Sequence, residues 1–577
     1  MRTGLSMKTF WASLAVAVLL VMTGAAEAGP LAPQPRVVAK YERDFIERSG
    51  AQTLQELLDT GIIRYFLTGG QNLLVLVNGR PYASTAGDLD PLPLSAVERI
   101  EVLGPDSLGT LGGATVRGAL NIVLRTDLDG FETRTVARAP SREGGDGWQG
   151  SVFWGGVVGR GGRMTLGVDM LDRQEIPGRA REHSRSEWVE GGSFSDAKNV
   201  SLSGNTVYVV QGQPDPNAPG GFDVTGLRSV ALGDCDPAQG YTGPLSNPPG
   251  IRNGDEGCGF AFGNIWWDTP SFEQQSAILN LDHPLGGDAE LHLDVNLTQS
   301  DSAFRYAPSV DVFTFTPDSD LLAAINEAAG EADPSFAADT NDLFAVGHRF
   351  VAHGNRDWVT DSEEYDLSLG VTGRLAEGLG YDARLDAWRW DSAVTGNTLV
   401  HGKTIQDAVQ AGHYDLADPF SQDANHLQAI TDSSLRQERD SGAEVLSARF
   451  ALEGSGFALG GRDAAWTAGV ELGRVEAHSL LRFRHVGGKH EGEIRDVREV
   501  LGSGGVSYAG DRNTSAAFAE ISLPLADRLD LRVAGRGVEY DDVGGLGYWR
   551  VGGEYRPPRI IARRGSGGPG EGAPAMA

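Results

Sequence analysis

The sequence predicts a mainly β protein, in which a small N-terminal α+β domain precedes an antiparallel transmembrane β-barrel of roughly a dozen strands. Three observations support this fold class. Short apolar runs between residues 73 and 125 end at Gly-rich turns. Amphipathic hairpins with a period of two follow Arg125, and their connections alternate between short turns and long polar loops. Glycine, at 79 of 577 residues, suits a fold with many turns.

The first 28 residues have the pattern of a secretory signal peptide. Lys8 precedes an apolar core at 10–22, and residues 26–28 read Ala-Glu-Ala, a small-x-small cleavage site. A membrane anchor is the alternative, but a helical span needs about 20 apolar residues. We therefore expect export, with the mature chain beginning at Gly29.

The α+β domain is expected over residues 29–128. The apolar runs at 73–77, 100–103 and 119–124 predict three strands, and a fourth is expected at 36–40. Thr53 and Glu56 have the spacing of a capping box at a helix N-terminus, as do Ser95 and Glu98. These elements predict a small mixed sheet with Gly-rich connections.

The motifs of this domain resemble the plug domain of TonB-dependent outer-membrane receptors. The matching segments read Leu-Leu-Val-Leu-Val-Asn-Gly-Arg-Pro at 73–81, Ala-Val-Glu-Arg-Ile-Glu-Val-Leu-Gly-Pro at 96–105 and Gly-Ala-Leu-Asn-Ile-Val at 118–123. The family usually has an arginine before the Gly-Pro pair, whereas here Leu103 is followed directly by Gly104. Leu111 also stands where a tyrosine is common. An unrelated periplasmic α+β domain is the alternative.

The resemblance implies a set of positions that seat the plug against the barrel wall rather than touch a ligand. They are Asn78, Gly79 and Arg80 in a turn, Glu98, Arg99 and Glu101 as charged contacts, Gly104 and Pro105 after the second strand, and Arg117, Gly118, Asn121 and Arg125 around the exit strand.

The barrel is expected over residues 129–556. In the segment 289–298, apolar and polar residues alternate strictly, which matches a tilted transmembrane strand of about 9 to 11 residues. The predicted hairpins pair 276–282 with 289–298, 148–158 with 164–171, 365–375 with 381–390, and 516–523 with 529–538.

The connections between the predicted strands differ at the two ends of the sheet. The loops at 172–272, 300–363 and 393–443 are long and polar, whereas the turns at 376–380 and 524–527 are short. Extracellular loops and periplasmic turns of outer-membrane barrels show this asymmetry. A soluble sandwich is the alternative. A short helix is predicted at 318–329.

Cys235 and Cys258, the only cysteines, lie in the first long loop. In an exported chain they predict one disulfide. A two-cysteine metal site is the alternative, although no histidine or third cysteine clusters with them. Five histidines of the long loops could help to bind a metal chelate, but we expect them to be scattered and exposed to solvent: His348, His353, His401, His413 and His426.

Catalytic motifs are absent from the sequence, which contains no Walker loop, no G-x-S-x-G, no H-E-x-x-H and no C-x-x-C. We therefore predict no enzyme activity, no catalytic residues, no cofactor and no resident metal. The net charge of -29 argues against nucleic acid as a partner, because a phosphate backbone requires a basic surface.

Residues 516–557 resemble the middle of the family's barrel, and 557–577 form a low-complexity tail without a period of two. We therefore expect a C-terminally truncated barrel, since a plugged transporter has about 22 strands. A complete smaller barrel is the alternative.

The resemblance implies a receptor in the cell outer membrane, with membrane lipids, a small ligand such as a ferric siderophore or other metal chelate, and the periplasmic protein TonB as partners. Only residues 29–35 are free for a TonB box, and no such motif is evident there. The alternative is a ligand-binding receptor that does not transport.

Overall fold

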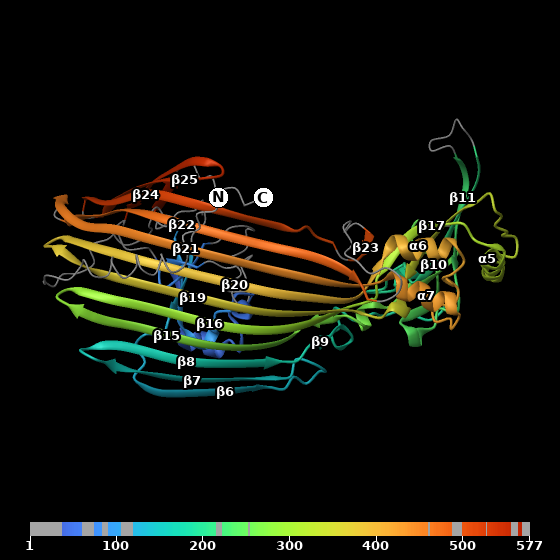
Figure 1. Cartoon of the computed structure of the whole chain (residues 1–577), viewed down its shortest axis with the longest axis horizontal. Helices are drawn as coiled ribbons and strands as arrows, with labels where there is room; N and C mark the ends of the chain where they lie inside the picture. The colour runs from blue at the N-terminus through green and yellow to red at the C-terminus, as the bar shows by residue number, and fades with distance from the viewer. Residues whose placement is uncertain are drawn as a thin grey trace.

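The computed structural model of the chain describes residues 37–59, 74–82, 91–104, 119–214, 222–251, 254–459, 462–486, 499–502, 504–526, 528–555 and 563–567. The predicted signal peptide and Pro105, Arg117 and Gly118 lie outside these residues. The described chain has three parts (Figure 1): a large sheet of long strands, a small plug domain against one face of that sheet, and a subdomain of loops at one end.

The plug is a five-stranded mixed sheet with the strand order β1-β4-β5-β2-β3, in which only β2 and β5 are parallel. Its elements are β1 (Val37–Glu42), α2 (Arg43–Arg48), α3 (Leu54–Asp59), β2 (Leu74–Val77), β3 (Arg80–Pro81), β4 (Val97–Leu103) and β5 (Ala119–Leu124). Leu54, Leu57, Val97, Ile100 and Ile122 are fully buried in its core. The four predicted strands are therefore confirmed.

One of the two predicted capping boxes is present in a modified form, in which Glu56 reaches the residue before the N-cap Thr53. At the start of α3, the Glu56 amide donates to Thr53 Oγ1 at 3.1 Å, and Glu56 Oε2 accepts from the Gln52 amide at 2.9 Å. The prediction for Ser95 and Glu98 was wrong. Ser95 lies inside a short 3₁₀ turn (Leu94–Ala96) that has no side-chain cap, and Glu98 already belongs to β4.

The large sheet is antiparallel, and its strands follow one another in the order β6-β7-β8-β15-β16-β19-β20-β21-β22-β24-β25-β26-β27. Their bounds are β6 (Gly130–Arg138), β7 (Gly147–Val158), β8 (Gly162–Arg173), β15 (Ser271–Gly286), β16 (Ala289–Tyr306), β19 (Arg356–Ala376), β20 (Leu379–His401), β21 (Ser434–Leu459), β22 (Arg462–His485), β24 (Tyr508–Ala526), β25 (Leu529–Tyr540), β26 (Gly544–Tyr555) and β27 (Arg563–Gly567). The four predicted hairpins are confirmed as β15·β16, β7·β8, β19·β20 and β24·β25.

Several strands are much longer than the alternating pattern predicts. β19, β20 and β21 have 21, 23 and 26 residues, against the 9 to 11 that cross a bilayer. The loops were predicted to begin at residues 300 and 393, but β16 continues to Tyr306 and β20 to His401. The reason is physical: a strand that is polar on both faces carries no period of two in its sequence, so Ser300, Asp301 and Ser302 of β16 give no strand signal although they remain paired to β19.

The long connections form a folded subdomain rather than polar loops. Its sheet has the order β11-β10-β18-β17, built from β10 (Asn205–Pro214), β11 (Phe222–Ala231), β17 (Val310–Phe315) and β18 (Leu343–Arg349). Three helices pack with it: α5 (Ser319–Ala332), α6 (Gly402–Gln410) and α7 (Ala424–Ser433). Phe344, Val346, Phe350, Ile325 and Ile405 are buried in their shared core.

Smaller elements complete the loop subdomain. Two short pairs are β9 (Ile176–Pro177) with β14 (Trp267–Thr269) and β12 (Tyr241–Ser246) with β13 (Glu256–Phe260), and β23 (Val500–Leu501) adds to β20. The predicted helix at 318–329 is confirmed as α5, and Asp318 caps it by accepting from the amides of Asp320 and Leu321.

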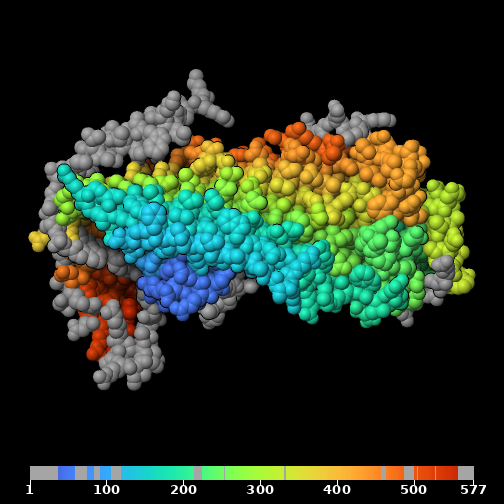
Figure 2. Space-filling model, turned by 90° about the horizontal axis from the view of Figure 1, so that it is seen from below, coloured from blue at the N-terminus to red at the C-terminus, as the bar shows by residue number. Residues whose placement is uncertain are grey.

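The plug stays accessible from one side of the sheet. In the space-filling view, its blue residues appear at the surface beside the cyan strands β6–β8 (Figure 2). Across the described residues, no helix is long and apolar enough to cross a membrane.

Candidate functional site: the seat of the plug

The turn between β2 and β3 is fixed to the neighbouring strand by two side chains. Asn78 and Gly79 have φ of 49° and 76°, which is the left-handed backbone of a tight hairpin turn. Asn78 Oδ1 accepts from the Leu124 amide, and the Gly79 amide donates to Asn121 Oδ1, both at 2.9 Å. This turn therefore aims the next residue, Arg80, away from the plug.

The side chain of Arg80 contacts the face of the large sheet that lies against the plug, which is called the wall below. Its guanidinium donates to both carboxylate oxygens of Asp366 on β19, at 3.0 and 2.5 Å, and lies 3.9 Å from Asp294 on β16. Arg80 is 3% exposed and Asp366 is 2% exposed. Two residues later, the buried Tyr82 hydroxyl donates to Glu364, which is also on β19.

Removing one member of a buried pair leaves an uncompensated charge, which costs about 3 to 5 kcal/mol. The Arg80 pair therefore fixes the position of the β2–β3 hairpin more strongly than an exposed ion pair could. Because Asp294 and Asp366 lie on adjacent strands, a single guanidinium also offsets their mutual repulsion across the sheet.

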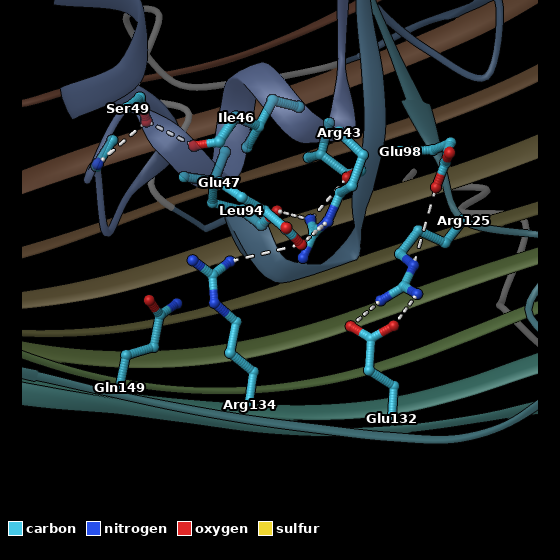
Figure 3. A network of polar contacts seen from close by, with 12 residues as sticks. Arg43, Ile46, Glu47, Ser49, Leu94, Glu98, Arg125, Glu132, Arg134 and Gln149 are labelled. Carbon is cyan, nitrogen blue, oxygen red and sulfur yellow. Dashed lines mark hydrogen bonds and ion pairs between the residues drawn. The ribbon is translucent and has the colours of Figure 1, made fainter.

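A second contact lies at the end of β5, where Arg125 joins the plug to β6 (Figure 3). Arg125 donates to both oxygens of Glu132 at 2.9 and 2.6 Å, and Glu98 of the plug lies 3.9 Å away on the opposite side. The guanidinium stacks 5.3 Å from the Phe153 ring, and the Arg125 carbonyl accepts from Asn280. Arg125 thus contacts three strands of the wall.

Arg43 of α2 holds together the part of the plug that faces β6, and sequence reasoning missed it. Its guanidinium donates to the carbonyls of Leu94 and Val97 and to Glu47, and Glu47 faces Arg134 of β6 at 3.9 Å (Figure 3). Arg43 lies outside the recognised motifs. The only sequence signal was its spacing of four residues from Glu47, which is common on exposed helices.

Glu56 also contributes to the seat in addition to capping α3. Its Oε1 accepts from Arg173 of β8 at 2.6 Å and lies 3.5 Å from Arg138 of β6. The capping box predicted the role of Glu56 within the plug, but nothing local to the sequence indicated its partners on the wall.

Two of the predicted charged contacts act inside the plug. Arg99 donates to Glu101 at 2.7 Å, and Glu101 accepts from Asn121 at 2.9 Å. The expectation that Arg99 and Glu101 contact the wall is not met among the described residues: both are partly buried on β4, Arg99 binds Glu101 on the same strand, and only Glu101 reaches β5, through Asn121. Gly104 is buried directly after β4.

The loop subdomain overturns a second expectation, because three of its histidines are buried. His348 bonds to Asn205 and to the Tyr414 hydroxyl, His353 to Ser433, and His426 is 1% exposed. Burial lowers the pKa of His348 and of His353 to about 3 each. His413, by contrast, is exposed as predicted.

Cys235 and Cys258 are joined by a disulfide, with Cα atoms 5.8 Å apart. Both residues are buried beside Tyr241 and Phe260, so the bond ties the β12–β13 pair to the segment after β11. Among the described residues, no group of three or more potential ligands could hold a metal ion.

The arrangement defines a class of protein: a plug domain held by buried charges against a sheet of long antiparallel strands whose loops gather at one end. No family model and no curated protein matches the chain. Its fold is that of TonB-dependent receptors of known structure.

Two of these structures are similar over most of this chain. A mutant of the ferric enterobactin receptor PfeA from Pseudomonas aeruginosa is 12% identical with a TM-score of 0.51, and the match covers 92% of this chain and 61% of that one. FpvAI in complex with pyocin S2 is 10% identical with a TM-score of 0.50, and the match covers 92% and 55%. The chain thus spans just over half to about three fifths of their length.

Proposed function

We propose that the protein is an outer-membrane receptor that captures a scarce small ligand, such as a ferric siderophore or another metal chelate, and admits it when TonB pulls on the plug. The observation that carries this proposal is the buried pair of Arg80 with Asp366. It joins a separate small domain to the large sheet through a side-chain contact rather than through shared strands, as expected of a plug that is a distinct unit.

The outward face of the sheet supports a place in the membrane. On β7 and β8, Val152, Leu166, Val168 and Met170 are 41 to 48% exposed. Soluble monomers rarely expose contiguous apolar surface, whereas barrel strands direct alternate apolar residues toward lipid. We propose that residues 1–28 direct export, which this location requires.

Iron accumulation in a strain without its own outer-membrane chelate receptors tests the transport proposal. Cells that produce the protein and receive radioactive iron as a siderophore chelate should accumulate more label than cells with an empty vector. A protonophore should abolish the difference, because uptake through a plug depends on an energised inner membrane. Label equal to that of the empty vector, for a protein present in the outer membrane, would argue against transport.

A second candidate function is binding without transport, and the edges of the sheet favour it. In the described part of the chain, β6 pairs only with β7 and β27 only with β26. Unpaired backbone groups in lipid cost several kcal/mol each. Ligand that binds to cells but does not accumulate against the protonophore control would support this candidate.

A further inference from the structure

Arg439 of β21 faces the inner side of the large sheet, above the plug. Along this strand, Val445 and Ala443 pack against the plug core and Ser441 bonds to Ser479, so every second residue points inward. Arg439 is the next residue in this series toward the loop subdomain. In the described part of the chain it makes no hydrogen bond and no ion pair, unlike the plug arginines.

A row of hydroxyl groups crosses the same inner face directly below Arg439. Five adjacent strands contribute one serine each at paired positions of the sheet, and the order along the row is Ser300, Ser362, Ser392, Ser441 and Ser479. Two bonds of 2.9 Å link them in pairs, Ser362 with Ser392 and Ser441 with Ser479. Each pair leaves one hydroxyl proton without an acceptor among the described residues.

The charges on the two sides of the wall differ sharply at this level. The inner row that contains Arg439 continues through Val394, Thr360 and Ser302, and neither this row nor the serine row contains a carboxylate. On the outer side, one row of paired positions holds five carboxylates: Asp172, Glu273, Asp301, Asp361 and Asp440. In a chain with a net charge of -29, two neighbouring inner rows that hold Arg439 and, among the described residues, no carboxylate are a local exception.

We propose that this inner wall binds an anionic ligand, with a carboxylate or phosphate group of the ligand on Arg439 and its other oxygen atoms along the serine row. A guanidinium binds such groups through two parallel hydrogen bonds, and the serine protons supply further donors. The inference rests on the proposed receptor function and names the charge class of its ligand. The proposed ligand site and the contacts that hold the plug then use different arginines, so the two can be tested independently.

A matched pair of probes tests the charge of the site: benzene-1,3,5-tricarboxylate and the neutral benzene-1,3,5-tricarboxamide, which share one shape. Binding to the full chain, extracted from outer membranes in detergent, is measured by calorimetry. We expect the tricarboxylate to bind and the triamide to bind at least about tenfold more weakly. Arg439→Gln should remove this preference, and added salt should weaken it.

Arg436→Gln is the matched control, because Arg436 lies on the same strand but points outward and pairs with Glu438. It should bind the tricarboxylate as the unmodified protein does. Ser392→Ala with Ser479→Ala should weaken binding by a smaller factor. Arg439→Lys, which keeps the charge, should retain part of the preference and shows that the position tolerates change.

Equal binding of the two probes, or unchanged tricarboxylate binding in Arg439→Gln, would overturn the inference. Neither result bears on membrane location or on energised iron accumulation, which test the receptor proposal separately. Charge-selective binding in a protein that accumulates no iron would instead support the inference and count against transport.

Discussion

Arg80 of the plug and Asp366 of β19 form a bidentate ion pair, 286 residues apart in the chain, in which both side chains are almost completely buried. Asn78 and Gly79 set the direction of Arg80, and Asp366 and Asp294 receive it. The plug is therefore held to the wall at a defined point, and this point can be tested by substitution.

Breaking the pair should lower the stability of the plug. Asp366→Asn should reduce the free energy of plug unfolding by about 3 to 5 kcal/mol, because the buried guanidinium loses its counter-charge. Protease susceptibility of the plug under increasing denaturant reports this change. Arg80→Met with Asp366→Leu, which removes both charges, should recover much of the loss.

Arg48→Ala is the control for this experiment. Arg48 pairs with Asp44 at 2.8 Å, but both side chains are 79% exposed, so little effect is expected. A plug that unfolds at the same denaturant concentration in Asp366→Asn as in Arg48→Ala would show that the Arg80 contact does not hold it.

Arg125 and Glu132 should be energetically coupled. A double-mutant cycle with Arg125→Met and Glu132→Gln should give a coupling energy of about 1 to 3 kcal/mol, because the two residues share two hydrogen bonds between plug and wall. The same protease assay measures it. Strictly additive effects would mean that the pair contributes nothing to plug seating.

The loop subdomain should lose stability in acid. His348 and His353 have a pKa of about 3 when folded, below the value near 6.5 of an exposed histidine. Above pH 6.5 these histidines are neutral in both the folded and the unfolded protein, so their burial does not reduce the stability of the subdomain. As the pH falls from 6.5 toward 3, only the unfolded state gains protons, and each histidine removes up to about 1.4 kcal/mol per pH unit.

Thermal unfolding of the subdomain between pH 7.5 and 4 measures this effect. His348→Gln should reduce the pH dependence, whereas His413→Gln, at an exposed position, should not. An unfolding temperature of the subdomain that is constant across this range would contradict the buried, neutral state of these histidines.

Removing the disulfide should loosen the subdomain and spare the large sheet. Cys235 and Cys258 are separated by 23 residues, and closing a loop of this size contributes about 3 kcal/mol in the chain-entropy model. In Cys235→Ser with Cys258→Ser, hydrogen exchange at β12 and β13 should become faster, with no change at β19 and β20. Equal exchange in the two proteins at β12 and β13 would refute this assignment.

Sequence reasoning predicted the elements whose signals are local. The period of two located the four hairpins because apolar and polar residues alternate along those strands. The spacing of Thr53 and Glu56 located the start of α3, and the Asn78-Gly79 pair located a hairpin turn. In each case, the residues that specify the element lie within about ten positions of one another.

The features that sequence reasoning missed depend on residues far apart in the chain, or on strand segments that are polar on both faces. Arg80 was expected to seat the plug, but Asp366 could not be chosen among the many acidic residues of the wall. The extensions of β19–β21 were missed because strands in water on both faces need no alternation. The subdomain was missed because its core combines three separate connections. Arg43 was missed because, apart from Glu47, its partners are backbone carbonyls far away in the chain.

Gel mobility after outer-membrane fractionation tests the central claim, a plugged membrane-spanning sheet, most directly. We expect the protein in the outer-membrane fraction and, on a semi-native gel, as a fast band that slows after boiling, because a stable sheet in detergent resists unfolding until it is heated. A protein found in periplasmic aggregates, with the same mobility before and after boiling, would contradict the account.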